Sequence, residues 1–305
     1  MTQLIGYVRT LENKDHRARG EQVLAALRTL GIEPTIQECR WLKVRNIAVD
    51  FSPDPKLVFS AHYDADKYSP GANDNGSGVA VLLGLCHELR HSEAPIRVIF
   101  FDREELRTPV VRLGCLGSFY YTLTNNLRSI CAVFNLEFCG LGDFLGIWPI
   151  KGSQSNLPAV QGVKRAATRL GLQFIIVNIP WLFINSDHLP FRLKGISNAF
   201  TLSLFPASQI PAMESLLENF SILRFLFGQR PTLPWPLSVI HTAQDTSAIL
   251  NEDSLRLMLS LLLELIQREE GKMVSEISNF ALTGYFNPAT PPSVTGSWYD
   301  RCRGA

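Results

Sequence analysis

Four short polar segments carry most of the residues in this chain that could do chemistry. They are, in chain order, AHYD (61–64), GANDNGSG (71–78), DREE (102–105) and NLE (135–137). Three of them follow apolar runs with strand character, and the second leads into a helical pattern. Open α/β sheets build their sites from loops beyond the carboxyl ends of the strands. We therefore expect these segments to meet at one edge of a sheet.

Such a meeting would bring four carboxylates into one crevice, those of Asp74, Glu104, Glu105 and Glu137. Like charges this close raise one another's pKa values or push the site apart. A pair of divalent cations removes the conflict, and imidazole with carboxylate ligands suits zinc. His62 supplies one imidazole, and His241 in the later segment IHTAQDT (240–246) can supply a second.

A rival metal-binding pattern is HELRH over residues 87–91, which matches HExxH. On a helix this spacing places two imidazoles on one face. The segment falls at the end of a predicted helix, and neither a downstream acid nor another histidine is clearly placed as a third ligand. We predict that His87 and His91 lie on a solvated helix end.

The elements that must position these segments alternate between helical and strand patterns. Helices are predicted over 10–30, 78–91, 157–170 and 252–268, and strands over 36–49, 56–60, 96–101, 130–136, 174–179 and 198–204. This order predicts one α/β domain with a doubly wound, mostly parallel but mixed sheet and helices on both faces. The domain is predicted to span residues 1–272, and 273–305 to form an irregular tail.

The composition narrows the class of protein. The chain has 305 residues, 46% of them hydrophobic, and 29 Lys plus Arg against 28 Asp plus Glu. This balance argues against nucleic-acid or polybasic membrane binding, and no apolar run is long enough to span a bilayer. The N-terminal sequence does not resemble a secretory signal, so a cytoplasmic location is expected. The six cysteines include no CxxC pair and are expected to be reduced.

Six separated motifs together resemble the M28 family of zinc exopeptidases. They are HYD (62–64), GANDNGSG (71–78), the glutamate pair 104–105, N-x-acid (135–137), SDH with a following Phe (186–191) and HT-x-x-DT (241–246). The resemblance runs from about Lys56 to near Arg268. It implies a zinc-exopeptidase fold and, as function, a di-zinc aminopeptidase that acts on short peptides with a free N-terminus.

Carried onto this sequence, the resemblance assigns five zinc ligands. Asp74 would bridge two zinc ions, His62 and Glu137 would complete one, and Glu105 and His241 would complete the other.

The same resemblance assigns the supporting roles. Glu104 would be the general base and acid, and Asp64 would hold the His62 ring through its other nitrogen. Asp187 is expected to lie behind the ligands, and the peptide bond between Asp74 and Asn75 is expected to be cis.

The chain departs from the family pattern at two places. Glu137 stands where the family usually has Asp, so the ligand arm is longer. The turn GCLGS (114–118) usually follows the glutamate pair at once, but here an insertion over 106–112 comes between them. The segment 205–238 is rich in aromatic residues and is predicted to form a pocket wall or an oligomer contact.

Two alternative functions follow from the same resemblance. Glutaminyl cyclases are similar to M28 peptidases, use one zinc, and share the SDH-x-P-F pattern found over 186–191. The intact GANDNGSG loop and the five ligands favour the peptidase. A non-catalytic binding protein would be expected to have lost ligands or the base, and this chain keeps them.

Overall fold

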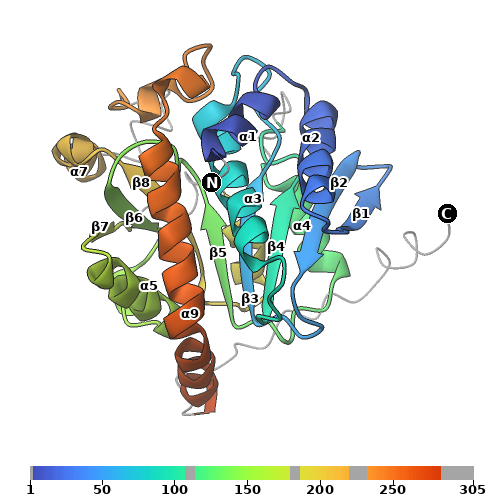
Figure 1. Ribbon diagram of the computed structural model, residues 1–305. Coiled ribbons are helices and arrows are strands. Elements are labelled where there is room, and N and C mark those ends of the chain that lie inside the picture. The colour runs from blue at the N-terminus through green and yellow to red at the C-terminus, as the bar shows by residue number, and fades with distance from the viewer. Residues whose placement is uncertain (1–2, 107–113, 179–185, 220–231, 283–305) are drawn as a thin grey trace, which may run out of the picture.

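Eight strands of the computed structural model, which describes residues 3–106, 114–178, 186–219 and 232–282, form one mixed sheet (Figure 1). They are β1 Thr35–Cys39, β2 Val44–Asp50, β3 Leu57–His62, β4 Ile96–Phe101, β5 Ala132–Leu136, β6 Phe144–Trp148, β7 Gln173–Ile176 and β8 Ala199–Phe205. Their order is β1-β2-β4-β3-β5-β8-β6-β7. The central strands β4, β3, β5 and β8 are parallel, and antiparallel pairs flank them on both sides. The predicted mixed α/β sheet is confirmed.

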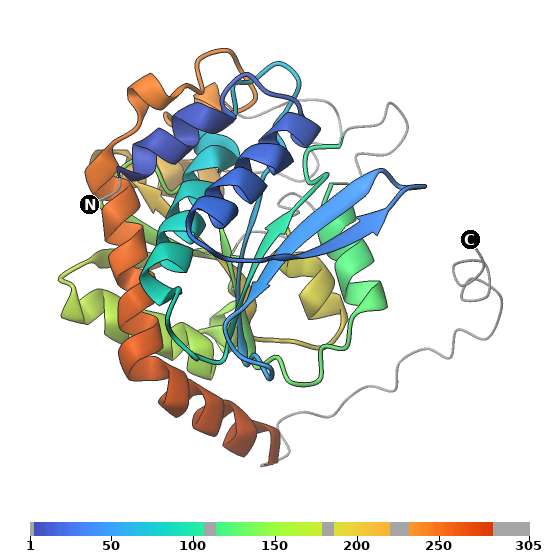
Figure 2. The same ribbon diagram turned by 45° about the vertical axis from the view of Figure 1, so that its right-hand side comes forward.

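Helices cover both faces of this sheet (Figures 1 and 2). One face carries α1 Leu4–Leu11, α2 His16–Thr29, α3 Ser77–Leu89, α5 Pro158–Arg169 and α9 Glu252–Leu282. The other carries α4 Leu116–Thr124 and α6 His188–Leu193, and α7 Ile210–Glu218 follows β8. Burial on two sides explains why the central strands are apolar along their whole length.

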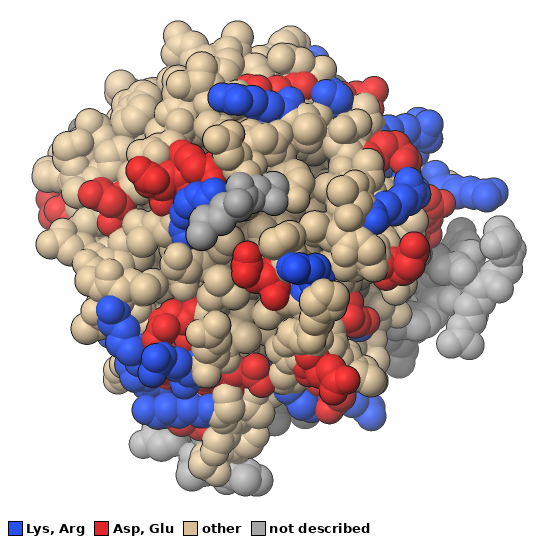
Figure 3. Space-filling model, in the orientation of Figure 1, with Lys and Arg blue, Asp and Glu red and all other residues tan. Residues whose placement is uncertain are grey.

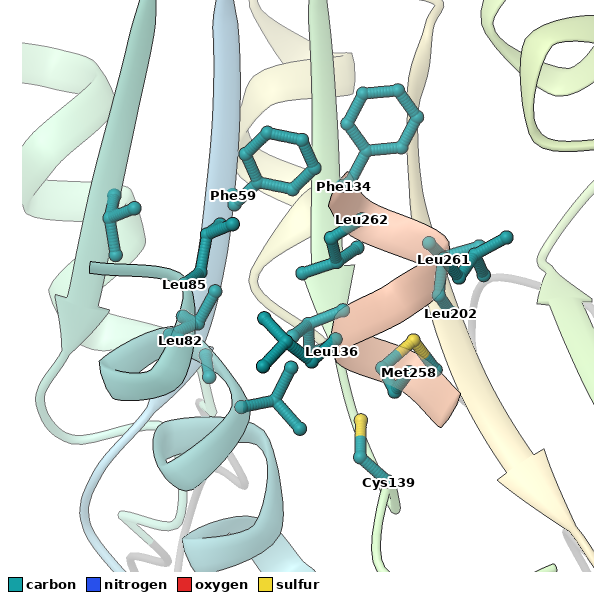
Figure 4. Packing of buried hydrophobic residues seen from close by; sticks show 14 of the residues in the cluster. Phe59, Leu82, Leu85, Phe134, Leu136, Cys139, Leu202, Met258, Leu261 and Leu262 are labelled. Carbon is teal, nitrogen blue, oxygen red and sulfur yellow. The ribbon is translucent and has the colours of Figure 1, made fainter. Parts of the chain in front are cut away.

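The main hydrophobic core lies between the sheet and the helices α3 and α9 (Figure 4). The rings of Phe59 and Phe134 stack at a centroid distance of 5.2 Å. Leu82 of α3 and Leu262 of α9 pack in the same cluster. This layer fixes the strands whose carboxyl ends carry the polar segments.

The N-terminal third differs in detail from the prediction. The helix predicted over 10–30 begins only at His16 as α2, because the Asp15 side chain accepts a hydrogen bond from the backbone N–H of Ala18 (2.9 Å) and caps its start. The separate helix α1 before it was not predicted. The strand predicted over 36–49 is the antiparallel hairpin of β1 and β2.

The long C-terminal helix continues into the segment predicted as a tail. Residues 273–282, predicted as part of an irregular tail, continue α9 to Leu282. Met273 is fully buried against Gly162 of α5, and Arg165 of α5 pairs with Glu269 at 2.7 Å. These contacts extend the helix beyond its apolar sequence pattern, and the remainder, 283–305, lies outside the described residues.

The surface and the helices show two further features. On the face that carries α9, basic and acidic side chains lie intermixed (Figure 3). In the described ranges, no helix is both long enough and apolar enough to span a membrane.

Candidate metal centre

The polar segments converge because β3, β4 and β5 are parallel neighbours. His62 pairs in register with Phe101, and Ser60 with Asn135, so the residues that follow these strands emerge at one edge of the sheet. The loop before α3 and the loop that carries His241 reach the same edge.

One half of the centre is formed by His62, Asp74 and Glu137, all buried. The Nε2 of His62 lies 3.2 Å from Oδ1 of Asp74 and 3.4 Å from Oε2 of Glu137.

The other half is formed by His241 and Glu105 around the second oxygen of Asp74. The Nε2 of His241 lies 3.0 Å from Oδ2 of Asp74 and 2.7 Å from Oε1 of Glu105. Each oxygen of Asp74 therefore faces a different histidine. The possible ligand atoms of His62, Asp74 and Glu105 all lie within 4.8 Å of one another.

Asp74 is held from outside its own loop. It lies in the irregular turn η1 Ala72–Gly76, and its peptide bond to Asn75 is cis, as the resemblance implied. The carboxylate of Asp245 accepts hydrogen bonds from the backbone N–H groups of Asn73 (2.7 Å) and Asp74 (3.1 Å). Asp245 is part of the HT-x-x-DT motif, but the sequence alone did not assign it this contact.

Asp64 has three contacts where one was expected. Its Oδ1 lies 3.4 Å from Nδ1 of His62, the ring nitrogen that faces away from Asp74. Its two oxygens also accept the backbone N–H groups of Glu104 (3.0 Å) and Glu105 (2.9 Å). Asp64 therefore ties the histidine to the glutamate pair.

Glu137 is held in place by neighbours that sequence reasoning missed. Its Oε1 accepts hydrogen bonds from Oγ of Ser186 (2.8 Å) and Nδ2 of Asn135 (3.3 Å), while Oε2 faces His62. The SDH motif thus contributes its serine to the centre, and the longer glutamate arm is accommodated by a hydrogen bond to that serine.

Asp187 is fully buried behind these groups. Its Oδ1 accepts a hydrogen bond from Oγ of Ser118 (2.5 Å), and its Oδ2 has no hydrogen-bond partner among the described residues. Burial raises the pKa of Asp187 to about 7. The neighbouring His188 is buried too, and its Nδ1 lies 2.8 Å from Oγ1 of Thr201.

Glu104 is half-buried, and its Oε1 lies 3.7 Å from Sγ of Cys115. Burial, and next the charge of Glu105, raise the pKa of Glu104 well above its ordinary value. A carboxyl group with a raised pKa can both take up and release a proton near neutral pH.

Four residues that border the centre have left-handed backbone conformations. They are Arg103 (φ 62°), Cys115 (64°), Phe138 (55°) and His241 (60°). For residues other than glycine this region costs about 1–3 kcal/mol each, and surrounding contacts must impose it. The conformation of the centre is therefore a tertiary property.

The carboxylates of the centre favour protonation of both histidines. Burial lowers the pKa of His241, but Asp74 and Glu105 outweigh this effect and raise it to about 10. Burial likewise opposes protonation of His62, and its carboxylate neighbours, Glu137 first, raise its pKa well above the usual value. A divalent ion can replace these protons between the same donors. The donor set, two imidazoles with several carboxylates, fits zinc.

Residues 46–266 match the sequence pattern of Peptidase family M28. The chain belongs to this family. It is 34% identical to the aminopeptidase YwaD of Bacillus subtilis over 155 residues, which are 48% of this chain and 31% of that protein. The chain spans about a third or less of the length of the first curated relatives it matches.

Two solved structures share the fold of this M28 chain. A glutaminyl cyclase from Bacteroides thetaiotaomicron, bound to N-acetylhistamine, is 20% identical, with a TM-score of 0.65 over 88% of this chain and 97% of that chain. A leucine aminopeptidase precursor from the same species is 21% identical, with a TM-score of 0.63 over 88% of this chain and 96% of that chain. At these identities the likeness shows the fold alone.

The HELRH segment of the M28 chain forms no comparable arrangement. α3 ends at Leu89, so His91 lies beyond the helix and is exposed. His87 is partly exposed, and its Nδ1 lies 3.3 Å from the side chain of Glu88.

Two predicted segments fall partly outside the described residues. Of the insertion over 106–112 only Leu106 is described. Of 205–238, the described parts include α7 and the residues from Thr232 onward, and 220–231 lie outside.

Proposed function

We propose that this M28 chain is a zinc-dependent aminopeptidase that removes N-terminal residues from short peptides, with two zinc ions at the centre described above. The cytoplasmic location expected from the sequence is part of the proposal and is checked by cell fractionation.

The position of Asp74 between the two histidines carries the proposal. Its two oxygens face His62 and His241 separately, and each half has its own further carboxylate, Glu137 or Glu105. A donor set divided in this way supports two ions that share one carboxylate. The aminopeptidase YwaD, the relative at 34% identity, supports cleavage at the N-terminus.

Zinc, when bound, supplies Lewis acidity that activates water and polarises the scissile carbonyl. The chain supplies the proton transfer. The carboxylate of Glu104 accepts a proton from the attacking water and passes it to the nitrogen of the leaving amine, which breaks the C–N bond. Asp64 holds the backbone of Glu104 in place throughout, because its carboxylate accepts the Glu104 N–H.

A single-zinc glutaminyl cyclase is the second candidate, and Asp187 favours it. Cyclisation of an N-terminal glutamine moves a proton from the attacking amine to the departing ammonia. Asp187, whose pKa burial raises to about 7, is a second acid at the centre. Like Glu104, it lies near the charges of His62 and Glu137.

The two candidates are separated by measuring zinc per chain together with turnover of leucyl and glutaminyl substrates. Two zinc ions and release of the amine from the leucyl substrate support the aminopeptidase. One zinc ion and cyclisation of the glutaminyl substrate support the cyclase, and a chain that binds no zinc contradicts both.

A further inference from the structure

The helices α1 and α2 precede residue 46, where the family match begins, yet they border the metal centre. Both lie on the same face of the sheet as α3 (Figures 1 and 2). Their apolar residues join the main core, but the side chains of His16 and Arg19 in α2, and of Glu12 at the C-cap of α1, contact segments that carry or adjoin the ligands.

Arg19 of α2 is fully buried, and its guanidinium donates four hydrogen bonds to backbone carbonyls. Nε donates to Tyr63, Nη1 to Leu11 and Pro70 (both 3.1 Å), and Nη2 to Gly71 (3.0 Å). A buried guanidinium is costly unless its N–H groups are satisfied. Here the planar fork of donors is matched by carbonyls from three separate segments of chain.

Three of these carbonyls lie between two predicted zinc ligands. Tyr63 directly follows His62, and Pro70 and Gly71 lead into the turn that carries Asp74. Gly71 has φ 68°, and a Cβ there would lie 3.0 Å from Nη1 of Arg19. Arg19 therefore holds both ends of the segment 63–71 and so sets where His62 and Asp74 stand relative to each other.

Two neighbours of Arg19 contact the other ligand-bearing segments. The carboxylate of Glu12 accepts hydrogen bonds from the backbone N–H (2.5 Å) and Oγ (2.7 Å) of Ser247, in the loop that carries Asp245 and His241. The Nδ1 of His16 lies 3.1 Å from Oδ1 of Asp102, at the end of β4 just before the glutamate pair.

We infer that Arg19 is a positioning residue of the zinc centre, and that α1 and α2, through Glu12, His16 and Arg19, hold together three of the chain segments that present or precede its ligands. The inference rests on the proposed zinc function. Arg19 reaches no substrate in this role and acts through the backbone of the segment 63–71.

The test compares zinc affinity in Arg19→Met, Arg19→Lys and the wild type, by competition with a chromophoric chelator at 25 °C. Arg165→Met is the matched control, because Arg165 also holds two elements together, α5 and α9, but through carboxylates of α9 that belong to no predicted site. Circular dichroism establishes that each variant is folded under the assay conditions.

Loss of a residue that supports metal ligands typically weakens metal binding or activity about 10–100-fold. We expect a weakening of this size in Arg19→Met, a smaller one in Arg19→Lys, which keeps the charge but not the planar fork, and none in Arg165→Met. If Arg19→Met does not fold, Arg19→Lys and Glu12→Ala replace it, and each should bind zinc more weakly than Arg165→Met.

Equal zinc affinity of the folded Arg19 variants and the wild type overturns the inference and leaves the proposed function intact. The inference is also overturned if Arg165→Met weakens zinc binding as much as Arg19→Met does, because the weakening then reflects a general loss of stability. A wild type that binds zinc but cleaves no peptide overturns the proposed function alone.

Discussion

The two ends of α3 both carry residues of types that bind metals, and they differ in how those residues are arranged. At the C-terminal end, the HELRH segment holds two histidines and a glutamate within five successive positions. At the N-terminal end, the turn before α3 contributes only Asp74, and the remaining donors arrive from four other segments of the chain.

The difference shows that proximity in sequence is a weak guide to a metal centre. α3 stops at Leu89, so the local pattern is split between a helix and the turn after it, with His87 partly exposed and His91 exposed. The dispersed residues converge because three neighbouring parallel strands end at one edge. The carboxylates gathered there also change the charge states of the histidines, since Asp74 and Glu105 outweigh burial and raise the pKa of His241 to about 10.

The largest expected effect at the N-terminal end is that of Asp74→Ala, which removes the carboxylate shared by both halves. We expect loss of zinc and of turnover. With free zinc at 100 times the wild-type dissociation constant, the wild type gains about 2.7 kcal/mol of unfolding free energy from the metal, and the variant should gain none. Thermal unfolding with and without zinc measures this, with Asp54→Ala as an exposed control. A zinc-dependent gain in Asp74→Ala equal to that of the wild type would contradict the assignment.

Glu104→Gln separates proton transfer from metal binding. We expect turnover to fall by a factor of about 10²–10⁴, since the base is lost while a side chain of the same shape remains. Zinc content should stay at the wild-type level. The control is Glu88→Gln, at the C-terminal end of α3, for which neither turnover nor zinc content should change. Full turnover by Glu104→Gln would remove the general base from the mechanism.

His188 is buried near the centre but is not among the predicted ligands. Its protonation should therefore change only the unfolding free energy. Burial lowers its pKa to about 3, so between about pH 6.5 and 3 the unfolded chain takes up a proton that the folded chain does not. The unfolding free energy therefore falls as the pH drops through this range.

For a group with these two pKa values, the unfolding free energy falls by about 2 kcal/mol between pH 8 and pH 5. Denaturant unfolding in the presence of a chelator should show this extra loss in the wild type relative to His188→Gln, which cannot titrate. Parallel pH dependences of the two proteins would show that folding does not lower the pKa of His188.

The smallest effects are expected at the C-terminal end of α3. His87→Ala and His91→Ala should each change the unfolding free energy by no more than about 0.5 kcal/mol, as is usual for exposed positions. Their zinc content and turnover should equal those of the wild type. Loss of zinc in either variant would mean that HELRH, and not the centre around Asp74, binds the metal.

Strongly apolar strands were predicted closely, whereas several short elements were missed. The strand over 96–101 coincides with β4, since six nearly continuous apolar residues suit a strand covered on both faces. β6 and α6, of five and six residues, were not predicted, because apolar runs of this length do not distinguish helix from strand.

Local sequence was enough to determine which residues could form the centre and that they follow apolar strands, because side-chain type and hydrophobic periodicity are properties of neighbouring residues. The contacts that complete the centre could not be derived in this way. Asp245 holding the Asp74 loop, Ser186 bonding Glu137 and Arg19 binding the segment 63–71 join residues far apart in the chain. Such contacts depend on strand order, register and the packing of α1 and α2, which arise only when the whole domain folds.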